Sequence, residues 1–311
     1  MLTELLAQPS YVIGCAFLFG LLIGSFLNVV ILRIPARLEW QWRRDSRELL
    51  GLDDTDLPEP HVPDPESTGT EAPEADGGGS VQPPGIVVER SFCPNCRHQL
   101  SALDNIPVLS WLALGGRCRY CKTRISLQYP LVELLTAIAS AVVVWQFGAA
   151  WQALAALFFT WTLIALAGID LRTTLLPDQL TYPLLWLGLL LSTITMFVDP
   201  VSALFGAMAG YLSLWSVFWL FKLATGKEGM GRGDFKLLAA LGAWCGIKGV
   251  FPIVLISALL GALIGSAWLL LRGRDRATQI PFGPYLAAAG WVQLLWGPQL
   301  IEAYLHLSGL R

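Results

Sequence analysis

Long apolar runs constrain this chain more than any other feature of its sequence. Six runs approach the roughly 20 helical residues that a bilayer crossing needs. They cover residues 11–32, 131–147, 151–169, 181–198, 201–223 and 250–271, with two weaker candidates at 235–246 and 281–296. Only 14% of the residues are charged, against roughly 25% in ordinary soluble domains. The sequence therefore predicts an all-α polytopic membrane protein with about eight transmembrane helices.

The distribution of Lys and Arg predicts the orientation of these helices. With the N-terminus outside, the inward connections carry nineteen basic residues, and the outward parts carry only Lys248 and Arg311. Cytosolic connections are enriched in Lys and Arg, although long loops count less. The first run lacks a basic segment before it and a small-residue cleavage site after it, so we expect it to stay as an anchor. Eight spans then leave both termini outside, and nothing in the charge pattern indicates a nucleic-acid partner.

The one sizeable region outside the bilayer, residues 33–130, divides in two. It begins with RLEWQWRRDSRELLGLDD, which predicts an amphipathic helix near the membrane surface. A stretch rich in Pro, Gly, Ser and acid follows, and it cannot bury enough apolar surface to order itself. We therefore expect domains at residues 1–32 (first helix and tail), 33–90 (amphipathic segment and flexible acidic linker), 91–130 (tetracysteine loop) and 131–311 (membrane-embedded domain).

The second half of this region contains two Cys-x-x-Cys pairs, Cys93/Cys96 and Cys118/Cys121, separated by 21 residues. Four thiolates on two tight turns are the ligand set of a structural, tetrahedral zinc ion. Two disulfides or four free thiols are the alternatives, and a cytosolic location disfavours disulfides. The pattern predicts a small cytosolic zinc-ribbon-like loop domain whose metal provides much of its folding free energy. His98 beside the second cysteine is a weaker candidate ligand.

Two acids lie where membrane spans meet the predicted cytosolic face. Counted in chain order over all eight runs, Asp170 ends the third (151–169) and Asp234 begins the sixth (235–246), 64 residues later. Two carboxylates in a partly desolvated site tend to share a proton, and such a pair can polarise an amide carbonyl and activate water. Peptide hydrolysis is the natural reaction of that arrangement.

These acids also have simpler explanations. A boundary acid is often a solvated end residue or a helix N-cap, and Asp234 could cap a helix that starts at Phe235. Asp178 is interpreted as a cap for the fourth span. Lys236 and Arg232 could neutralise the acids or contact lipid phosphate. The glycines before Asp234 are not a nucleotide loop, because no Lys-Ser/Thr pair follows them and no strand precedes them.

Several motifs in order resemble the type IV prepilin peptidases, also called prepilin leader peptidase/N-methyltransferases. They are GSFLNVVILRIP at 24–35, SFCPNCRHQLSALDNIPVLSWLALGGRCRYCKTRISLQYPLVELL at 91–135, GIDLRTTLLPDQLTYP at 168–183, GMGRGDFKLLAALGAWCG at 229–246 and PFGPYLAAAG at 281–290. The resemblance implies an aspartic peptidase of the bacterial inner membrane, in which Asp170 and Asp234 match the two catalytic aspartates.

The resemblance also implies the substrates and a second activity. Members cut type IV prepilins and type II secretion pseudopilins after the Gly that ends a short basic leader. Many then methylate the new N-terminus with S-adenosylmethionine. The methyl donor's site is unknown from the sequence, and the polar residues within matching motifs are its candidates: Asn28, Arg33, Asp104, Asn105 and Glu133.

Two other classes of function stay open at this point. In a proton-coupled transporter, membrane acids would relay protons, but it should carry acids deep within its spans. A non-catalytic assembly scaffold would use the zinc loop to bind partners. The reading that the residues and the resemblance favour is a prepilin peptidase with its active site and zinc loop in the cytosol and both termini in the periplasm.

Overall fold

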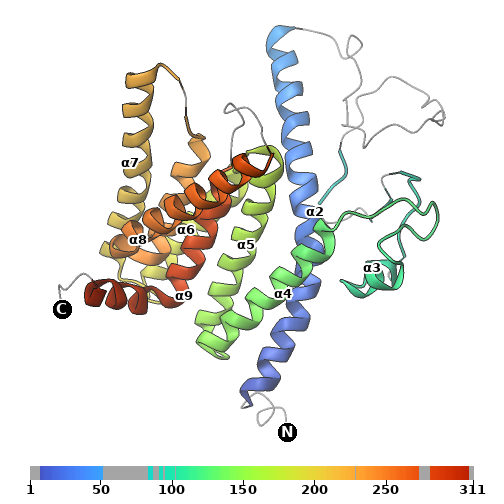
Figure 1. Cartoon of the computed structure of the whole chain (residues 1–311), viewed down its shortest axis with the longest axis horizontal. Coiled ribbons are helices and arrows are strands. Elements are labelled where there is room, and N and C mark those ends of the chain that lie inside the picture. Colours follow the sequence, from blue (N-terminus) through green and yellow to red (C-terminus); the bar gives the residue numbers. More distant parts are fainter. Residues whose placement is uncertain are drawn as a thin grey trace. The chain divides into compact units, whose positions relative to one another are not determined.

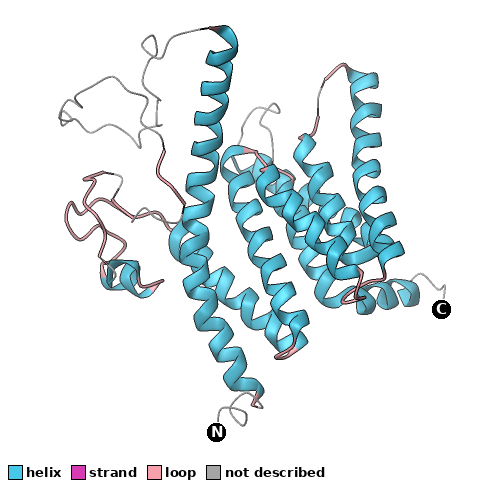
Figure 2. Ribbon diagram, turned by 180° about the vertical axis from the view of Figure 1, so that it is seen from behind, coloured by secondary structure: helices cyan, strands magenta, loops and turns pink. Residues whose placement is uncertain are grey.

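Helices make up nearly all of the regular structure. The structure is a computed structural model that describes residues 8–51, 83–86, 91–93, 95–101, 103–227, 229–272 and 281–307. The helices are, in chain order, α2 (Pro9–Leu50), the 3-10 turn η1 (Leu103–Asn105), α3 (Leu109–Ala113), α4 (Gln128–Phe147), α5 (Trp151–Thr173), α6 (Asp178–Ser192), α7 (Pro200–Thr225), α8 (Arg232–Arg272) and α9 (Gly283–Leu307) (Figure 1). Within these described ranges the chain forms no strand, only isolated bridges (Figure 2). The all-α prediction is confirmed.

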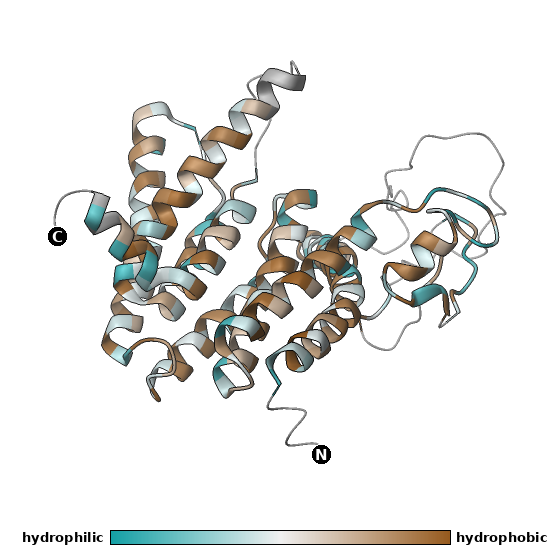
Figure 3. Ribbon diagram, turned by 60° about the horizontal axis from the view of Figure 1, so that its bottom comes forward, coloured by the Kyte–Doolittle hydropathy of each residue, from teal (hydrophilic) through white to brown (hydrophobic). Residues whose placement is uncertain are grey.

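Five of these helices are long and apolar enough to cross a membrane. They are Pro9–Leu50, Gln128–Phe147, Trp151–Thr173, Pro200–Thr225 and Arg232–Ala267. Figure 3 shows apolar residues, in brown, along the long helices. Each of the eight predicted apolar runs lies largely on a helix, but α6 is only 15 residues long. The membrane class is therefore confirmed, while the number of eight crossings stays a prediction.

The chain divides into two compact units, residues 1–31 with 90–311 and residues 32–89. In the smaller unit the helix that began at Pro9 continues to Leu50, through an internal Pro35. The predicted amphipathic segment thus extends the first helix instead of forming a separate one. In that unit Arg33 donates to the Gly85 carbonyl. Residues 52–82, which hold most of the predicted acidic linker, lie outside the described residues.

Two helices contain an internal break where the sequence places weaker apolar runs. In α8 the break is at Gly246, whose φ of 70° and ψ of 174° are not helical. In α9 it is at Trp296, with φ −129° and ψ 20°. Gly246 divides the predicted runs at 235–246 and 250–271, and Trp296 ends the predicted run at 281–296. Both breaks therefore fall where the sequence analysis ends a span.

The core lies between α5, α6, α7, α8 and α9, and small residues let the helix backbones approach closely. A Cβ on Gly210 of α7 would lie 2.5 Å from the Leu238 carbonyl oxygen of α8. Gly24 of α2 similarly faces α4, where a Cβ would lie 2.6 Å from the Cα of Glu133. Helices in a membrane gain no hydrophobic free energy by associating, so close backbone packing of this kind helps to hold them together. The largest fully buried side chains of this core include Trp244, Phe159, Leu166, Leu184, Leu237 and Leu286.

Candidate active site and metal site

Asp170 lies near the end of α5 and is only 4% exposed. Its Oδ2 accepts a hydrogen bond of 2.9 Å from the backbone N–H of Gly283, the first residue of α9. Amides at a helix N-terminus lack partners within the helix and favour negative charge. A Cβ on Gly283 would lie 2.7 Å from Oδ2, so the carboxylate reaches this amide only because residue 283 is glycine.

Asp234 lies in the first turn of α8 and is 6% exposed. The Gly231 backbone hydrogen-bonds to its carboxylate. The neighbouring glycines leave room for packing: a Cβ on Gly229 would lie 2.7 Å from the Phe221 ring, and one on Gly233 would lie 2.7 Å from the Cβ of Leu176. This glycine-rich segment therefore folds closely onto its surroundings and carries Asp234 inward.

The structure brings Asp170 and Asp234 close enough for their charges to interact. Leu176 lies next to both Gly233 and Gly283, the glycines beside the two acids. Both carboxylates are buried, which does not fit solvated end residues. Because α8 begins at Arg232, Asp234 lies inside the helix and is not its N-cap. The structure therefore gathers two buried carboxyl groups around one side chain, that of Leu176.

Asp178 has a different role from the predicted helix cap. The N-cap of α6 is Pro177, and no side chain caps the helix. Instead the Asp178 carboxylate accepts from Nζ of Lys236 at 2.6 and 2.8 Å. The ammonium also lies 5.1 Å from the centre of the Tyr182 ring. The capping prediction for Asp178 is wrong, because a lysine of α8 provides a stronger, charged partner.

The four predicted metal ligands, Cys93, Cys96, Cys118 and Cys121, form one cluster with all sulfur atoms within 4.8 Å of one another. All four are free thiols. The Cys93 and Cys121 sulfurs are 3.7 Å apart, close to the edge of about 3.8 Å that a tetrahedral site with zinc–sulfur bonds of about 2.3 Å would have. His98 is outside the cluster and stacks on Tyr120. This donor set can hold a metal ion.

The two cysteine pairs lie on turns of the same construction. The N–H of Cys93 donates to the His98 carbonyl and that of Cys118 to the Thr123 carbonyl, at 2.9 and 2.8 Å. One residue after each pair, at Arg97 and Lys122, the backbone has a positive φ of 54° and 60°. This conformation bends the chain so that both sulfurs of a pair face the same point.

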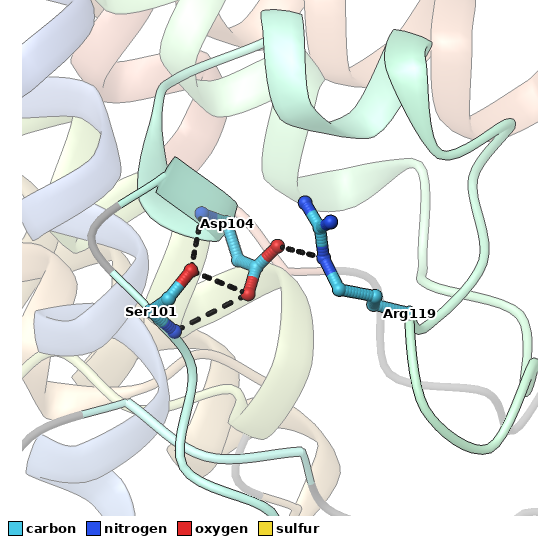
Figure 4. Close-up of polar contacts among 3 residues, drawn as sticks. All are labelled: Ser101, Asp104 and Arg119. Carbon is cyan, nitrogen blue, oxygen red and sulfur yellow. Dashed lines mark hydrogen bonds and ion pairs between the residues drawn. The ribbon is translucent and has the colours of Figure 1, made fainter.

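A small polar group ties the segment between the two cysteine pairs to the second pair (Figure 4). The Asp104 carboxylate accepts from the Ser101 hydroxyl at 2.7 Å and from Nε of Arg119 at 2.8 Å. These hydrogen bonds, the Ser101 bond first, hold the pKa of Asp104 below its ordinary value. Asp104 thus ties the first half of the loop to the second.

The candidates for the methyl donor's site fall in different places. Asn28 and Glu133 are buried between α2 and α4, at 2% and 7% exposure. Asp104 belongs to the loop's own hydrogen bonds, Asn105 is exposed on η1, and Arg33 belongs to the smaller unit. Only Asn28 and Glu133 come together, because Gly24 lets α2 and α4 approach at their level.

Sequence reasoning missed two residues that contact these candidates. Gly283 donates to Asp170 from 113 residues further along the chain; its only signal is the PFGP motif, to which the sequence analysis assigned no role. The Ser25 hydroxyl hydrogen-bonds to the Glu133 carboxylate. Ser25 could have been identified as a polar residue one turn before Asn28 on an apolar helix.

Two family models match the chain. Residues 18–147 match the Bacterial Peptidase A24 N-terminal domain, and residues 157–266 match the Type IV leader peptidase family. Among curated proteins, the chain is 56% identical over 292 residues to the prepilin leader peptidase/N-methyltransferase of Xanthomonas campestris, with 94% of each chain covered. It is 48% identical over 312 residues to the protein of that name from Pseudomonas aeruginosa, with 100% of this chain and 99% of that one covered. No solved structure matches.

Proposed function

The chain belongs to the type IV leader peptidase family, and from this we propose that it removes leader peptides from prepilins and methylates the new N-terminus. The observation that carries the proposal is full-length similarity to relatives of that bifunctional name. It decides against a transporter and against a non-catalytic scaffold. We extend the substrates to type II secretion pseudopilins, cut after the Gly of a basic leader.

In the proposed peptidase step, Asp170 and Asp234 act as a pair, one ionised and one protonated. The ionised carboxylate takes a proton from water, whose oxygen bonds to the carbonyl carbon, while the protonated carboxyl gives its proton to the carbonyl oxygen. Breaking the C–N bond then passes a proton to the nitrogen and yields a new carboxyl group and a free amine. The Gly283 N–H, which bonds Asp170 at 2.9 Å, supports this by orienting that carboxylate.

The location of the acids suits a substrate with a basic leader and an apolar helix. The leader stays in the cytosol and the helix in the bilayer, so the junction between them lies at the membrane surface. Asp170 near the end of α5 and Asp234 near the start of α8 meet the same membrane face if the helices are oriented as the basic residues predict. We place the protein in the inner membrane with this face cytosolic and both termini periplasmic.

We assign zinc to the tetracysteine cluster, with Cys93, Cys96, Cys118 and Cys121 as ligands. Thiolate sets with this spacing favour zinc, and a cytosolic loop disfavours disulfides. Burial raises the pKa of the Cys93 thiol to about 12, so metal binding has to displace its proton. The ion would stabilise the loop and take no part in hydrolysis.

S-adenosylmethionine, the proposed methyl donor, supplies a methyl group on a positively charged sulfur. The chain offers a buried acceptor that suits a ligand with hydrogen-bond donors: Oδ1 of Asn28 is buried and has no partner among the described residues. The buried Glu133 carboxylate of α4 lies at the same interface, where α2 and α4 pack together.

The deciding experiment uses the purified full chain in detergent with an authentic prepilin, with and without S-adenosylmethionine. Mass spectrometry should show loss of the leader in both reactions, and the mass of one additional methyl group only with the methyl donor. A prepilin left intact would reject the peptidase, and a cleaved but unmethylated product would reject the second activity. A pseudopilin in place of the prepilin tests the wider substrate range.

A further inference from the structure

A second polar site lies apart from the aspartate pair, between the tetracysteine loop and the helices α2 and α4. Glu133 is the one acid among the described residues of this site. Its Oε2 accepts from the Val108 N–H at 2.7 Å, and the Ser25 hydroxyl bonds to the same carboxylate. Both partners are neutral, and among the described residues no basic group contacts Glu133. A carboxylate has about four acceptor positions, so this buried acid has capacity left for a further donor.

Asn28 adds an acceptor one turn from Ser25. Its Nδ2 donates to the Tyr129 carbonyl at 3.1 Å and to the Gly24 carbonyl at 3.3 Å, which fixes the amide. Its Oδ1 is buried without a hydrogen-bond partner in the part of the chain that the structure describes. Buried acceptors without a partner are rare in proteins, because leaving one unpaired costs free energy. Gly24, whose carbonyl holds this amide, packs directly on Glu133, so the unpaired oxygen and the carboxylate belong to the same short stretch of the α2–α4 interface. An unpaired acceptor and an acid in one place favour a ligand that carries several N–H donors and a positive charge.

The loop residue at this site has an unfavourable backbone conformation. Val108 has φ 58° and ψ −48°, a region that β-branched residues rarely adopt. This conformation directs its N–H to Glu133. Residues held in such strain cluster at functional sites. Because Ser25, Val108 and Tyr129 are each partly exposed, the cluster has access to the surface.

Contacts between neighbouring helices connect the polar site to the part of α5 that carries Asp170. Ile31, one turn after Asn28, packs against Gly168 of α5, where a Cβ would be 2.9 Å from Cγ1 of Ile31. Arg172 of α5 donates to Oε1 of Gln128 at 2.7 Å. Gln128 precedes Tyr129, the residue whose carbonyl holds Asn28. Two independent contacts thus join the last turns of α5, which bear Asp170, to this site and to the first turn of α4.

We propose that Glu133 and Asn28 bind the ammonium group of a methyl-transfer reactant. The inference rests on the proposed function, because the peptidase step creates a free amine near Asp170 and the second activity uses one. Two molecules share this chemistry: the new N-terminus of the processed substrate, and the amino-acid end of the methyl donor. The ammonium would donate to the Glu133 carboxylate and to Oδ1 of Asn28, and it would neutralise the buried charge.

The test measures binding to the purified full chain by calorimetry. S-adenosylhomocysteine is compared with methylthioadenosine, which lacks the amino-acid end, and a processed pilin peptide is compared with its N-acetylated form. Glu133→Gln should weaken binding of at least one ammonium-bearing probe about tenfold or more, since a charged hydrogen bond is lost. Binding of the matching probe that lacks the ammonium, methylthioadenosine or the N-acetylated peptide, should not change. Which pair responds identifies the bound molecule.

Thr136→Val is the matched control. Thr136 is also buried on α4, three residues beyond Glu133, at 0% exposure against 7%, and its hydroxyl donates to the Val132 carbonyl of its own helix. The control should bind all four probes as wild type does. Glu133→Asp should restore part of the affinity, and it replaces Glu133→Gln if that variant does not fold. Unchanged binding of both ammonium probes in the Glu133 variants, or equal weakening by Thr136→Val, would overturn the inference.

Parallel assays separate this inference from the proposed function. The methylated fraction of the cleaved product should fall in Glu133→Gln relative to wild type and to Thr136→Val. If wild type neither cleaves nor methylates, the proposed function itself fails. If wild type does both while the Glu133 variants bind and methylate normally, only the ammonium site fails.

Discussion

The aspartate pair and the tetracysteine loop are positioned in opposite ways. Asp170 and Asp234 are carried by α5 and α8, whose side chains pack with those of α6, α7 and α9 in one buried cluster. Among the described residues of the loop, the buried apolar side chains are those of Pro107, Cys93 and Cys118, and the two cysteines are proposed metal ligands. One site is therefore held by helix packing, and we expect the other to be held by its metal ion. Changes to packing, to the acids and to the thiols should consequently have separable effects.

The largest effect should follow removal of a carboxylate from the pair. Asp170→Asn or Asp234→Asn should lower the rate of leader removal by about 10²–10⁴-fold or more, because each removes an acid–base group. Rates are measured by mass spectrometry of prepilin cleavage. Thermal unfolding in detergent and metal content should stay at wild-type values. Full cleavage by either variant would refute the proposed pair.

Packing is tested next, with Gly210→Val. The added side chain would collide with the Leu238 carbonyl, which a Cβ alone would approach to 2.5 Å, and such overpacking costs about 1–3 kcal/mol or more. We expect a lower unfolding temperature and slower cleavage but unchanged metal content. Gly261→Ala is the control, since a Cβ there has ordinary contacts from 3.4 Å. Equal stability of the two variants would contradict the packing argument.

Removal of the thiols should have the opposite effect to Gly210→Val: metal binding should be lost and the helix packing should stay unchanged. Cys93→Ser combined with Cys118→Ser should abolish binding of about one metal ion per chain, as measured by elemental analysis. Amide hydrogen exchange should rise in the loop but not in α5 or α8. Cys245→Ser, outside the cluster, is the control for loss of a thiol. Unchanged metal content would reject the metal site. Faster exchange throughout the helices would show that the loop and the helix core are not stabilised independently.

The smallest effect concerns the turn after the second cysteine pair. Lys122 has a φ of 60°, which costs an ordinary L-residue free energy that glycine does not pay. Lys122→Gly should therefore leave the loop's stability unchanged or raise it by up to about 1 kcal/mol. The rate of metal release to a chelator measures this. Arg124→Gly, at a position without positive φ, should instead release metal faster, and the reverse order would disprove the turn argument.

Patterns that depend on one segment could be predicted from the sequence. The apolar runs identified the helices, and the gap between the runs at 235–246 and 250–271 coincides with the break at Gly246. The spacing of the cysteines indicated a single cluster because two short turns can present four sulfurs. Counting basic residues predicted that Asp170 and Asp234 lie at one face of the membrane, and in the structure Leu176 lies beside the glycines next to both acids.

Contacts between distant backbone groups could not be predicted in this way. The Gly283 N–H reaches Asp170 only through the packing of α9 on α5, which no local pattern encodes. The Lys236–Asp178 pair likewise depends on how α6 meets α8, so a sequence rule assigned Asp178 to a cap. The continuation of α2 to Leu50 was missed because the basic, amphipathic composition after residue 36 indicated a new element.

The break at Gly246 also bears on how the protein adapts to its bilayer. An unbroken helix over Arg232–Arg272 would be about 60 Å long, twice the hydrocarbon thickness of about 30 Å. The Ser202 hydroxyl accepts the Ile247 N–H at 3.3 Å, so this backbone group has a partner without water. With the break, α8 consists of two segments, 232–246 and 247–272, of about 22 and 39 Å. The segment long enough to cross the bilayer is thus not the one that bears Asp234, and the acid lies on the short segment before it.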